Sequence, residues 1–404
     1  MTRILICLLS GLCLVAGHVN ARPLDQLLQL RLGHMKDVAA YKWHHNLPIE
    51  DVKREKVVLK QASLQGLRYG LRVESSEHFF QLQIEAAKEI QRYWFEHWNN
   101  NPDLRPGLVP DLKSEIRPVL IELGNQITRA LTEQPSSKPG SISVEGLSTE
   151  TANRLLDATQ IIETYPNQLS QVLEAGILRV GTTGDYEPFS YLSKGARQAI
   201  YEGIDIDLAR DLAQSLQVEL VWIETSWPAL MMDLNSGGFD IGMSGISINL
   251  VRQRTAFFSL PYHEGGKTPI IRCVDKDQFR SLADIDKAGI RIIVNPGGTN
   301  QKFVTGSIRN AEVRVHQDNR TIFSEIANDH ADVMITDAIE VRLQSANDSN
   351  LCPAMPGKTL TYSQKGYLLP QDTVWKEYIN TWLSLRIEQG TVKKIFASHL
   401  DPSY

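Results

Sequence analysis

Several features that would direct a first interpretation are missing from this 404-residue sequence. Its formal net charge is −5 and its isoelectric point is near 6.1, so it lacks the basic excess typical of a nucleic-acid-binding protein. The apolar run at 4–16 is too short to span a bilayer. His44, His45, His316 and His330 lack the spacing of metal ligands. We therefore expect no nucleic-acid partner, no membrane partner for the mature chain, no metal and no cofactor.

Cysteine is scarce as well, and two of the four cysteines lie in an N-terminal segment that has the features of a cleavable leader. Residues 1–21 have the layout of a secretory signal peptide, in which Arg3 precedes the apolar run and Val19-Asn20-Ala21 forms a small-residue cleavage site. We expect cleavage after Ala21 and release into a bacterial periplasm.

That cleavage would remove Cys7 and Cys13. The remaining even pair, Cys273 and Cys352, would then face an oxidising compartment, where such pairs are typical of a disulfide. Two buried free thiols are the alternative.

The layout of the chain changes along its length. Its size predicts two or three domains, and 42% hydrophobic residues are enough for ordinary cores. Apolar residues recur at helical spacing from 23 to 130, a polar proline-rich stretch follows, and strands alternate with helices from 177 onward. The predicted divisions are a signal peptide at 1–21, a helical domain at 22–133, a linker with a connecting helix at 134–165, and an α/β domain at 166–404.

Four helices are expected before the linker. Leu47-Pro48-Ile49 should end the first, and the second should run from Glu50-Asp51 to about Tyr69. Ser75 or Ser76 should cap the third, and Pro110-Asp111 should open the fourth.

Cations share the apolar face of these helices. Arg31 and Lys42 are about three turns apart and point the same way as the leucines around them, and Arg117 sits among inward residues. Buried cations need partners, which a dianionic ligand inside the bundle would supply. The alternative is that they are exposed and paired with acidic neighbours, namely Glu50, Glu55 and Glu85.

Over residues 24–130 the chain resembles the exported, all-helical class of chorismate mutases. The resemblance is carried by Arg31, Ala40-Tyr41-Lys42-Trp43, Leu47-Pro48-Ile49-Glu50-Asp51, Arg54-Glu55, Phe79-Phe80, Gln83-Ile84, Ala87-Lys88 and Ile90-Gln91. It implies rearrangement of chorismate to prephenate without covalent chemistry or a metal.

This resemblance also implies roles for single residues. Arg31, Arg54 and Arg117 would hold the two carboxylates, and Lys42 and Gln91 would face the ether oxygen, where negative charge grows as the bond breaks. Glu55 would meet the ring hydroxyl and Asp51 would orient its neighbours. Ala87 departs from relatives that often carry a hydroxyl residue there.

The α/β part is organised around the stretch Gly237–Arg254. It reads as a buried strand, a glycine turn and the start of a helix, which Asn249 can cap. Two serine hydroxyls at 244 and 247, free backbone N–H groups and Arg252 in one segment suit a carboxylate. The alternative is a strand–turn–helix with surface serines and a solvated arginine.

The order of the predicted strands and helices resembles that of the two-lobed periplasmic solute-binding fold (type II). The motifs that resemble those of its amino-acid-binding members are Gly203-Ile204-Asp205-Ile206-Asp207, Met243-Ser244-Gly245-Ile246-Ser247 before Arg252, and Phe258-Ser259-Leu260-Pro261-Tyr262. The resemblance implies a first lobe at about 170–271 and 362–404, and a second lobe at about 272–361 that holds both cysteines.

Finer motifs over about 170–400 are similar to cyclohexadienyl dehydratases, which dehydrate prephenate or arogenate. They are Gly181-Thr182-Thr183-Gly184-Asp185-Tyr186, Thr225-Ser226-Trp227-Pro228, Gly266-Lys267-Thr268-Pro269, Asn295-Pro296-Gly297-Gly298-Thr299-Asn300 and Thr336-Asp337-Ala338-Ile339-Glu340. By this resemblance Glu340 is the general acid, with its pKa raised by closure of the lobes.

The other roles follow from the same resemblance. Lys267 and Asn295 would contact the reacting end of the substrate, and Arg252, Ser247 and Thr299 would hold the side-chain carboxylate. Asp185 and Trp227 would line the pocket, and Ser244 and Asp337 are expected to bind substrate.

The two resemblances describe consecutive reactions, chorismate to prephenate and then prephenate to phenylpyruvate, or arogenate to phenylalanine. The substrates would be small molecules, and a homo-oligomer is left open. The competing hypotheses are a binding protein for an aromatic or anionic solute that carries a mutase-like bundle, and a chain in which one half is an inactive relic.

Overall fold

The computed structural model describes residues 22–133, 140–194 and 199–400, so the expected signal peptide and part of the linker lie outside the described residues. The chain forms two compact units, Met1–Ala62 with Glu77–Ile162, and Ser63–Ser76 with Glu163–Tyr404. Within the described ranges, no helix has the length and apolar character needed to cross a membrane.

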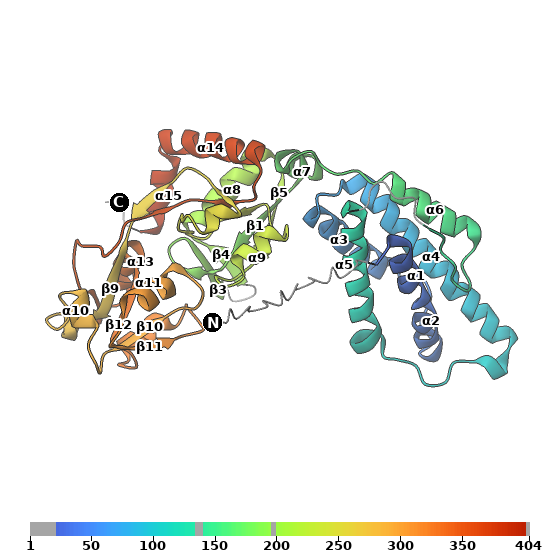
Figure 1. Ribbon diagram of the computed structural model, residues 1–404, viewed down its shortest axis with the longest axis horizontal. Coiled ribbons are helices and arrows are strands. Elements are labelled where there is room, and N and C mark those ends of the chain that lie inside the picture. The colour runs from blue at the N-terminus through green and yellow to red at the C-terminus, as the bar shows by residue number, and fades with distance from the viewer. Residues whose placement is uncertain (1–21, 134–139, 195–198, 401–404) are drawn as a thin grey trace, which may run out of the picture. The chain divides into compact units, whose positions relative to one another are not determined.

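The first unit is built from amphipathic helices that bury their apolar faces against one another (Figure 1). Its core includes Leu28, Phe79, Ile90 and Ile127, all fully buried. Its helices are α1 (Leu24–Gly33), α2 (Met35–His44), α5 (Arg117–Glu133), α6 (Thr149–Gln160) and the greater parts of α3 (Val52–Arg68) and α4 (Val73–Asn100).

Two helix boundaries differ from the prediction. The expected first helix is interrupted at His34, directly after Gly33, a residue with low helix propensity. The predicted serine cap of α4 is wrong, because the helix begins at Val73. The Ser75 and Ser76 hydroxyls instead donate to carbonyls three residues back, inside the first turns of the helix.

The fourth predicted helix does open at Asp111, whose Oδ1 accepts hydrogen bonds from the N–H groups of Lys113 and Ser114. One π-helical turn (Leu112–Ile116) precedes α5. Pro118 is the second residue of α5, directly after this turn, and has no N–H to donate to a carbonyl oxygen of the turn.

The second unit has two lobes, each with its own five-stranded sheet (Figure 1). The first lobe has strand order β5-β1-β6-β15-β7, with β1 parallel to β5 and β6, and β15 antiparallel to β6 and β7. Its strands are β1 (Ile177–Thr182), β5 (Glu219–Glu224), β6 (Ile241–Gly242), β7 (Phe257–Phe258) and β15 (Leu368–Leu369). Its helices are α7 (Gln168–Ala175), α8 (Ile204–Leu216), α9 (Leu230–Asn235), α14 (Thr373–Glu388) and α15 (Thr391–His399), and α15 packs on both α8 and α14.

A three-stranded antiparallel sheet follows β1, formed by β2 (Asp185–Tyr186), β3 (Ser190–Lys194) and β4 (Ala199–Glu202). The predicted buried strand around Ile241 is shorter than expected, although Phe239 and Met243 on either side are fully buried.

The sheet of the second lobe has the order β11-β10-β12-β9-β13. Its strands are β9 (Lys267–Arg272), β10 (Arg291–Val294), β11 (Glu312–Val315), β12 (Val333–Asp337) and β13 (Leu351–Pro353), and its helices are α10 (Leu282–Ile285), α11 (Thr299–Ser307), α12 (Ile322–Ala327) and α13 (Ala338–Asn347). Ile292 and Val294 face one core while Ile293 faces another, so β10 is apolar along its whole length because both faces of the sheet are covered.

Two short antiparallel strands connect the lobes, β8 (His263–Gly265) and β14 (Ser363–Lys365). Because β9 already belongs to the second sheet, the first crossing precedes Lys267 and lies before the expected boundary at 271/272. Ile339 of α13 packs into the core of the first lobe, so the two lobes are closed on each other.

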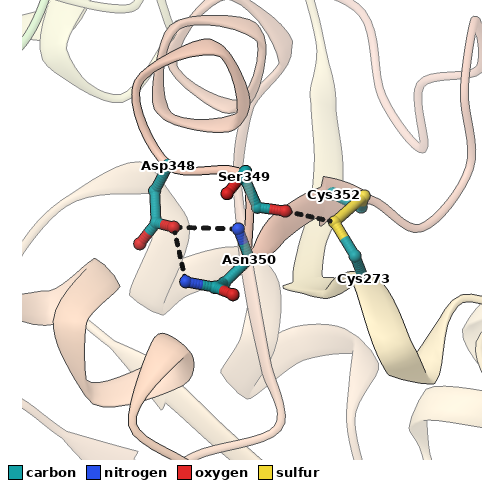
Figure 2. The surroundings of a disulfide bond; sticks show 5 residues. All are labelled: Cys273, Asp348, Ser349, Asn350 and Cys352. Carbon is teal, nitrogen blue, oxygen red and sulfur yellow. Dashed lines mark hydrogen bonds between the residues drawn. A yellow bond between two sulfur atoms is a disulfide. The ribbon is translucent and has the colours of Figure 1, made fainter.

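A disulfide joins Cys273 to Cys352 within the second lobe, with Cα atoms 4.8 Å apart (Figure 2). The bond ties the end of β9 to its antiparallel neighbour β13. The Ser349 carbonyl oxygen lies 3.3 Å from Cys273 Sγ, which is a contact rather than a hydrogen bond because a bridged sulfur carries no hydrogen.

The disulfide predicts the outcome of a thiol titration. Protein that lacks residues 1–21, denatured without a reductant, should show no free thiol because Cys273 and Cys352 are bridged. The same sample after reduction should show two. Two titratable thiols before reduction would rule the bridge out.

Candidate active sites

In the first unit, Arg31 is a part-buried cation that has no carboxylate partner among the described residues. Its Nε donates to Gln83 Oε1 at 3.0 Å, and its Nη1 donates to the Leu120 carbonyl oxygen at 3.1 Å. Desolvation lowers the pKa of Arg31 to about 10. A guanidinium held by neutral groups from α4 and α5 is a position where an anionic ligand would be stabilised.

Lys42 lies at the centre of a charged cluster. Its Nζ donates to the Ile49 carbonyl oxygen at 2.7 Å, and burial lowers its pKa. The charged groups close enough to act on it are Asp51, Glu55, Lys88 and Arg117. The structure thus gathers residues from α2, the start of α3, α4 and α5 around one ammonium.

Lys88 was not predicted as a site residue. Its Nζ lies 3.1 Å from Glu55 Oε2, and both side chains are largely shielded from solvent. The signal was its position three residues before Gln91, on the same face of α4.

Gln91 is oriented differently from its expected role. Its Nε2 donates to the Ala87 carbonyl oxygen at 3.0 Å, and its buried Oε1 has no partner among the described residues. A contact from Nε2 to an ether oxygen would require that Nε2 leave Ala87.

Asp51 and Arg54 are joined at the start of α3. Asp51 Oδ1 accepts a hydrogen bond from the Arg54 backbone N–H at 3.0 Å, and the Asp51 N–H donates to Glu55 Oε1 at 3.2 Å. These two bonds form a reciprocal cap. Asp51 therefore fixes the point from which the half-buried Arg54 side chain extends.

In the second unit, a cavity lies between the two lobes. It is lined by Tyr186, Trp227, Gly245, Ser247, Arg252, Asn295, Gly298, Thr299, Asn300, Asn319, Asp337 and Lys365. Most of these residues follow strands, where the ligand sites of α/β sheets are expected. The predicted site residues among them are Trp227, Ser247, Arg252, Asn295, Thr299 and Asp337.

Asp337, at the end of β12, is buried between two lysines. Its Oδ2 accepts hydrogen bonds from Lys365 Nζ and from the Tyr186 hydroxyl, both at 2.6 Å, and its Oδ1 lies 3.5 Å from Lys267 Nζ. Burial alone would raise the pKa of Asp337, but Lys365 and Lys267 hold it well below its usual range. Asp337 is therefore ionised at neutral pH.

Glu340 has the opposite electrostatic environment in the first turn of α13. It is buried, and Thr336 Oγ1 donates a hydrogen bond to its Oε2. Burial raises the pKa of Glu340 to about 8, and the negative charge of Asp337 adds to this rise. Two neighbouring carboxyl groups thus differ in protonation at neutral pH, which is the usual arrangement of an acid beside a charged residue.

Arg252 is buried on the opposite lobe, where its Nη1 donates to the Ser247 carbonyl oxygen at 3.2 Å. Burial lowers its pKa to about 10, and no ion pair of Arg252 occurs among the described residues. The predicted helix there is one 3₁₀ turn (Arg252–Arg254), whose first N–H donates to Asn249 Oδ1 as expected of a cap.

Four predicted site residues of this unit do not line the cavity: Asp185, Ser244, Lys267 and Glu340. Ser244 Oγ is engaged with Thr183 at 2.8 Å, on the first lobe. Asp185 accepts a hydrogen bond from Trp227 Nε1 at 3.1 Å, so it positions that ring. Lys267 Nζ donates to Thr299 Oγ1 at 3.1 Å, and Glu340 Oε2 accepts a hydrogen bond from Thr336 Oγ1.

Asp205 supports the turn that faces the cavity. Its buried Oδ2 accepts hydrogen bonds from the Gly245 N–H at 2.6 Å and from the Tyr262 hydroxyl at 2.9 Å. Gly245 has φ of +62°, and a Cβ there would lie 2.6 Å from the rings of Phe189 and Tyr186, so glycine is required.

No group of three metal-ligating residues occurs in the described part of the chain.

Family comparisons match both units. Residues 178–402 match the bacterial extracellular solute-binding proteins of family 3, and residues 22–92 match chorismate mutase type II. The expected fold class, a helical mutase-type bundle followed by a two-lobed α/β domain, is confirmed, as is the predicted fusion of two families.

Individual relatives cover each unit in turn. The cyclohexadienyl dehydratase of Pseudomonas aeruginosa is 46% identical over 237 residues, which are 59% of this chain and 87% of that protein. A secreted chorismate mutase of Yersinia pestis is 37% identical over 108 residues, 27% of this chain and 57% of that protein. The crystal structure of an ancestral amino acid-binding protein, described as a precursor of cyclohexadienyl dehydratase, is 30% identical with a TM-score of 0.53, and covers 57% of this chain and 99% of that one.

Proposed function

The chain belongs to family 3 of the bacterial extracellular solute-binding proteins, and we propose that it uses this fold for catalysis rather than for transport. It is a bifunctional enzyme of phenylalanine biosynthesis. The helical unit rearranges chorismate to prephenate. The two-lobed unit removes water and carbon dioxide from prephenate or arogenate, which gives phenylpyruvate or phenylalanine. The observation that carries the second activity is Glu340, a buried carboxyl with a pKa of about 8 beside an ionised aspartate.

In the helical unit, the proposed mechanism is positioning and electrostatics. Arg31, Arg54 and Arg117 hold the two carboxylates of chorismate in a compact conformer, which converts a flexible dianion into one ready to react. Lys42 supplies a fixed positive charge to the ether oxygen as the C–O bond breaks. The cluster that the structure gathers around Lys42 supports this assignment.

In the two-lobed unit, the proposed mechanism is general acid catalysis. Glu340 gives its proton to the leaving ring hydroxyl, which departs as water. The ring carboxylate leaves as carbon dioxide, and its bonding electron pair completes the aromatic ring. Asp337 cannot serve as the acid because the two lysines keep it ionised. Arg252, Ser247 and Thr299 hold the side-chain carboxylate.

We place both reactions in the periplasm. The solute-binding family is extracellular, one relative is a secreted mutase, and residues 1–21 read as a signal peptide. The substrates are small molecules that reach the protein from solution.

The test is incubation of the mature protein with chorismate alone, followed by absorbance. Because the product of the first reaction is the substrate of the second, chorismate should disappear and phenylpyruvate should appear after a short lag. Accumulation of prephenate without further conversion would rule out the proposed dehydratase activity. Binding of supplied prephenate without any turnover would favour a solute receptor.

A further inference from the structure

The cavity between the lobes has no free carboxylate. Asp337 is the one acidic residue among the described residues that line it. Both of its oxygens are engaged, Oδ2 by Lys365 and Tyr186 at 2.6 Å each and Oδ1 by Lys267 at 3.5 Å. A ligand ammonium group would have to displace one of two buried lysines to reach Asp337.

The side chains in and directly beside the cavity also carry an excess of positive charge. Lys267 and Lys365 share the single negative charge of Asp337, and Arg252 has no ion-pair partner among the described residues. Glu340 adds no negative charge at neutral pH because burial raises its pKa to about 8. The site is therefore suited to a ligand with two negative charges and no positive charge.

Prephenate and arogenate differ at one group. Both carry a ring carboxylate and a side-chain carboxylate, but the side chain of prephenate has a 2-oxo group where that of arogenate has an ammonium. A carbonyl oxygen accepts hydrogen bonds, and the lining of the cavity offers donors for it in Asn295 Nδ2 and the Thr299 hydroxyl, whose oxygens accept from Asn300 and Lys267. A buried ammonium without a carboxylate partner would lose its hydration without compensation.

We infer that the two-lobed site selects the 2-oxo acid prephenate over the amino acid arogenate, and that the pairing of Asp337 with Lys365 enforces this choice. The inference rests on the proposed dehydratase function. It makes Lys365 a specificity-determining residue, since its Nζ binds both Ser247 Oγ at 3.1 Å and the carboxylate that an ammonium would need.

The first measurement needs no variant. For the intact chain at neutral pH, kcat/KM for prephenate should exceed that for arogenate roughly 10- to 100-fold, mostly through KM, because the unpaired ammonium weakens binding. Equal values, or a preference for arogenate, would overturn the inference while leaving the dehydratase function in place. If neither compound is converted, the proposed function itself fails, and the inference fails with it.

The second measurement uses Lys365→Met, which keeps the length of the side chain and frees Asp337 Oδ2 from the lysine. The ratio of kcat/KM values should shift toward arogenate by roughly tenfold or more, because an ammonium can then take the place of the lysine. Lys394→Met, at an exposed lysine of α15, is the matched control and should leave the ratio unchanged.

A folded Lys365→Met protein with the original ratio would show that this pairing does not set the choice. If that variant does not fold, the ratio measured on the intact chain still decides whether prephenate is selected. The affinities of phenylpyruvate and phenylalanine for the intact chain give a third readout, and the 2-oxo acid should bind more tightly.

Discussion

Glu340→Gln is expected to bind prephenate normally and to dehydrate it roughly 100- to 10,000-fold more slowly, the usual contribution of a positioned general acid. Glutamine keeps the shape of the side chain and can still pair with the Thr336 hydroxyl, but it has no proton to give. The rate of phenylpyruvate formation from prephenate is the measurement. Conversion of chorismate to prephenate should be unchanged, because that reaction takes place in the helical unit.

The same assignment fixes the direction of the pH profile. Since the pKa of Glu340 is raised to about 8, the acid is protonated below that pH and is lost as the pH rises through it. The rate of enzymatic dehydration should therefore fall on the alkaline side, and Asp337 should add no step near neutral pH because it stays ionised there.

Glu377→Gln, at an exposed glutamate of α14, is the control for the loss of one carboxylate from the same unit. It should retain the full rate of dehydration. If Glu340→Gln converts prephenate as fast as the unmodified protein does, another residue of the two-lobed unit must be the acid.

Arg54→Ala should lower turnover of chorismate roughly 100-fold or more, since it removes a charge-assisted contact to a substrate carboxylate. The fold should tolerate the change, because it is the backbone N–H of Arg54 that binds Asp51, while no hydrogen bond of its side chain occurs among the described residues. The measurement is kcat/KM for chorismate, with dehydration of supplied prephenate as the internal control.

Lys56→Ala is the matched control for Arg54→Ala, because it removes an exposed cation two residues further along α3. It should leave both reactions unchanged. Full mutase activity in Arg54→Ala would exclude this arginine from the chorismate site.

Several residues that short motifs single out in the sequence line the cavity of the second unit. Trp227, Ser247, Arg252, Asn295 and Thr299 all line the cavity, and each lies in or shortly after a segment whose glycine, proline or serine content marks the end of a strand. Local patterns of this kind constrain the backbone over a few residues. They bring together side chains whose strands end at the same edge of a sheet.

Lys365 could not be found in this way. In the sequence it follows Ser363 and Gln364, which is typical of a solvent-exposed strand. Its burial depends on Asp337, which lies 28 residues earlier, and on Ser247, which lies 118 residues earlier. A charge that is stabilised by such distant partners has no local signature.

The disulfide of the second lobe determines which parts of the chain stay covalently linked. Cys273 and Cys352 close a ring of chain within one lobe, while the crossing strands β8 and β14 lie outside that ring. Rotation of one lobe against the other therefore neither stretches nor relaxes the bond. A single cleavage of the backbone between Cys273 and Cys352 would leave two fragments joined by the disulfide. On a denaturing gel they would migrate as one species until a reductant separates them.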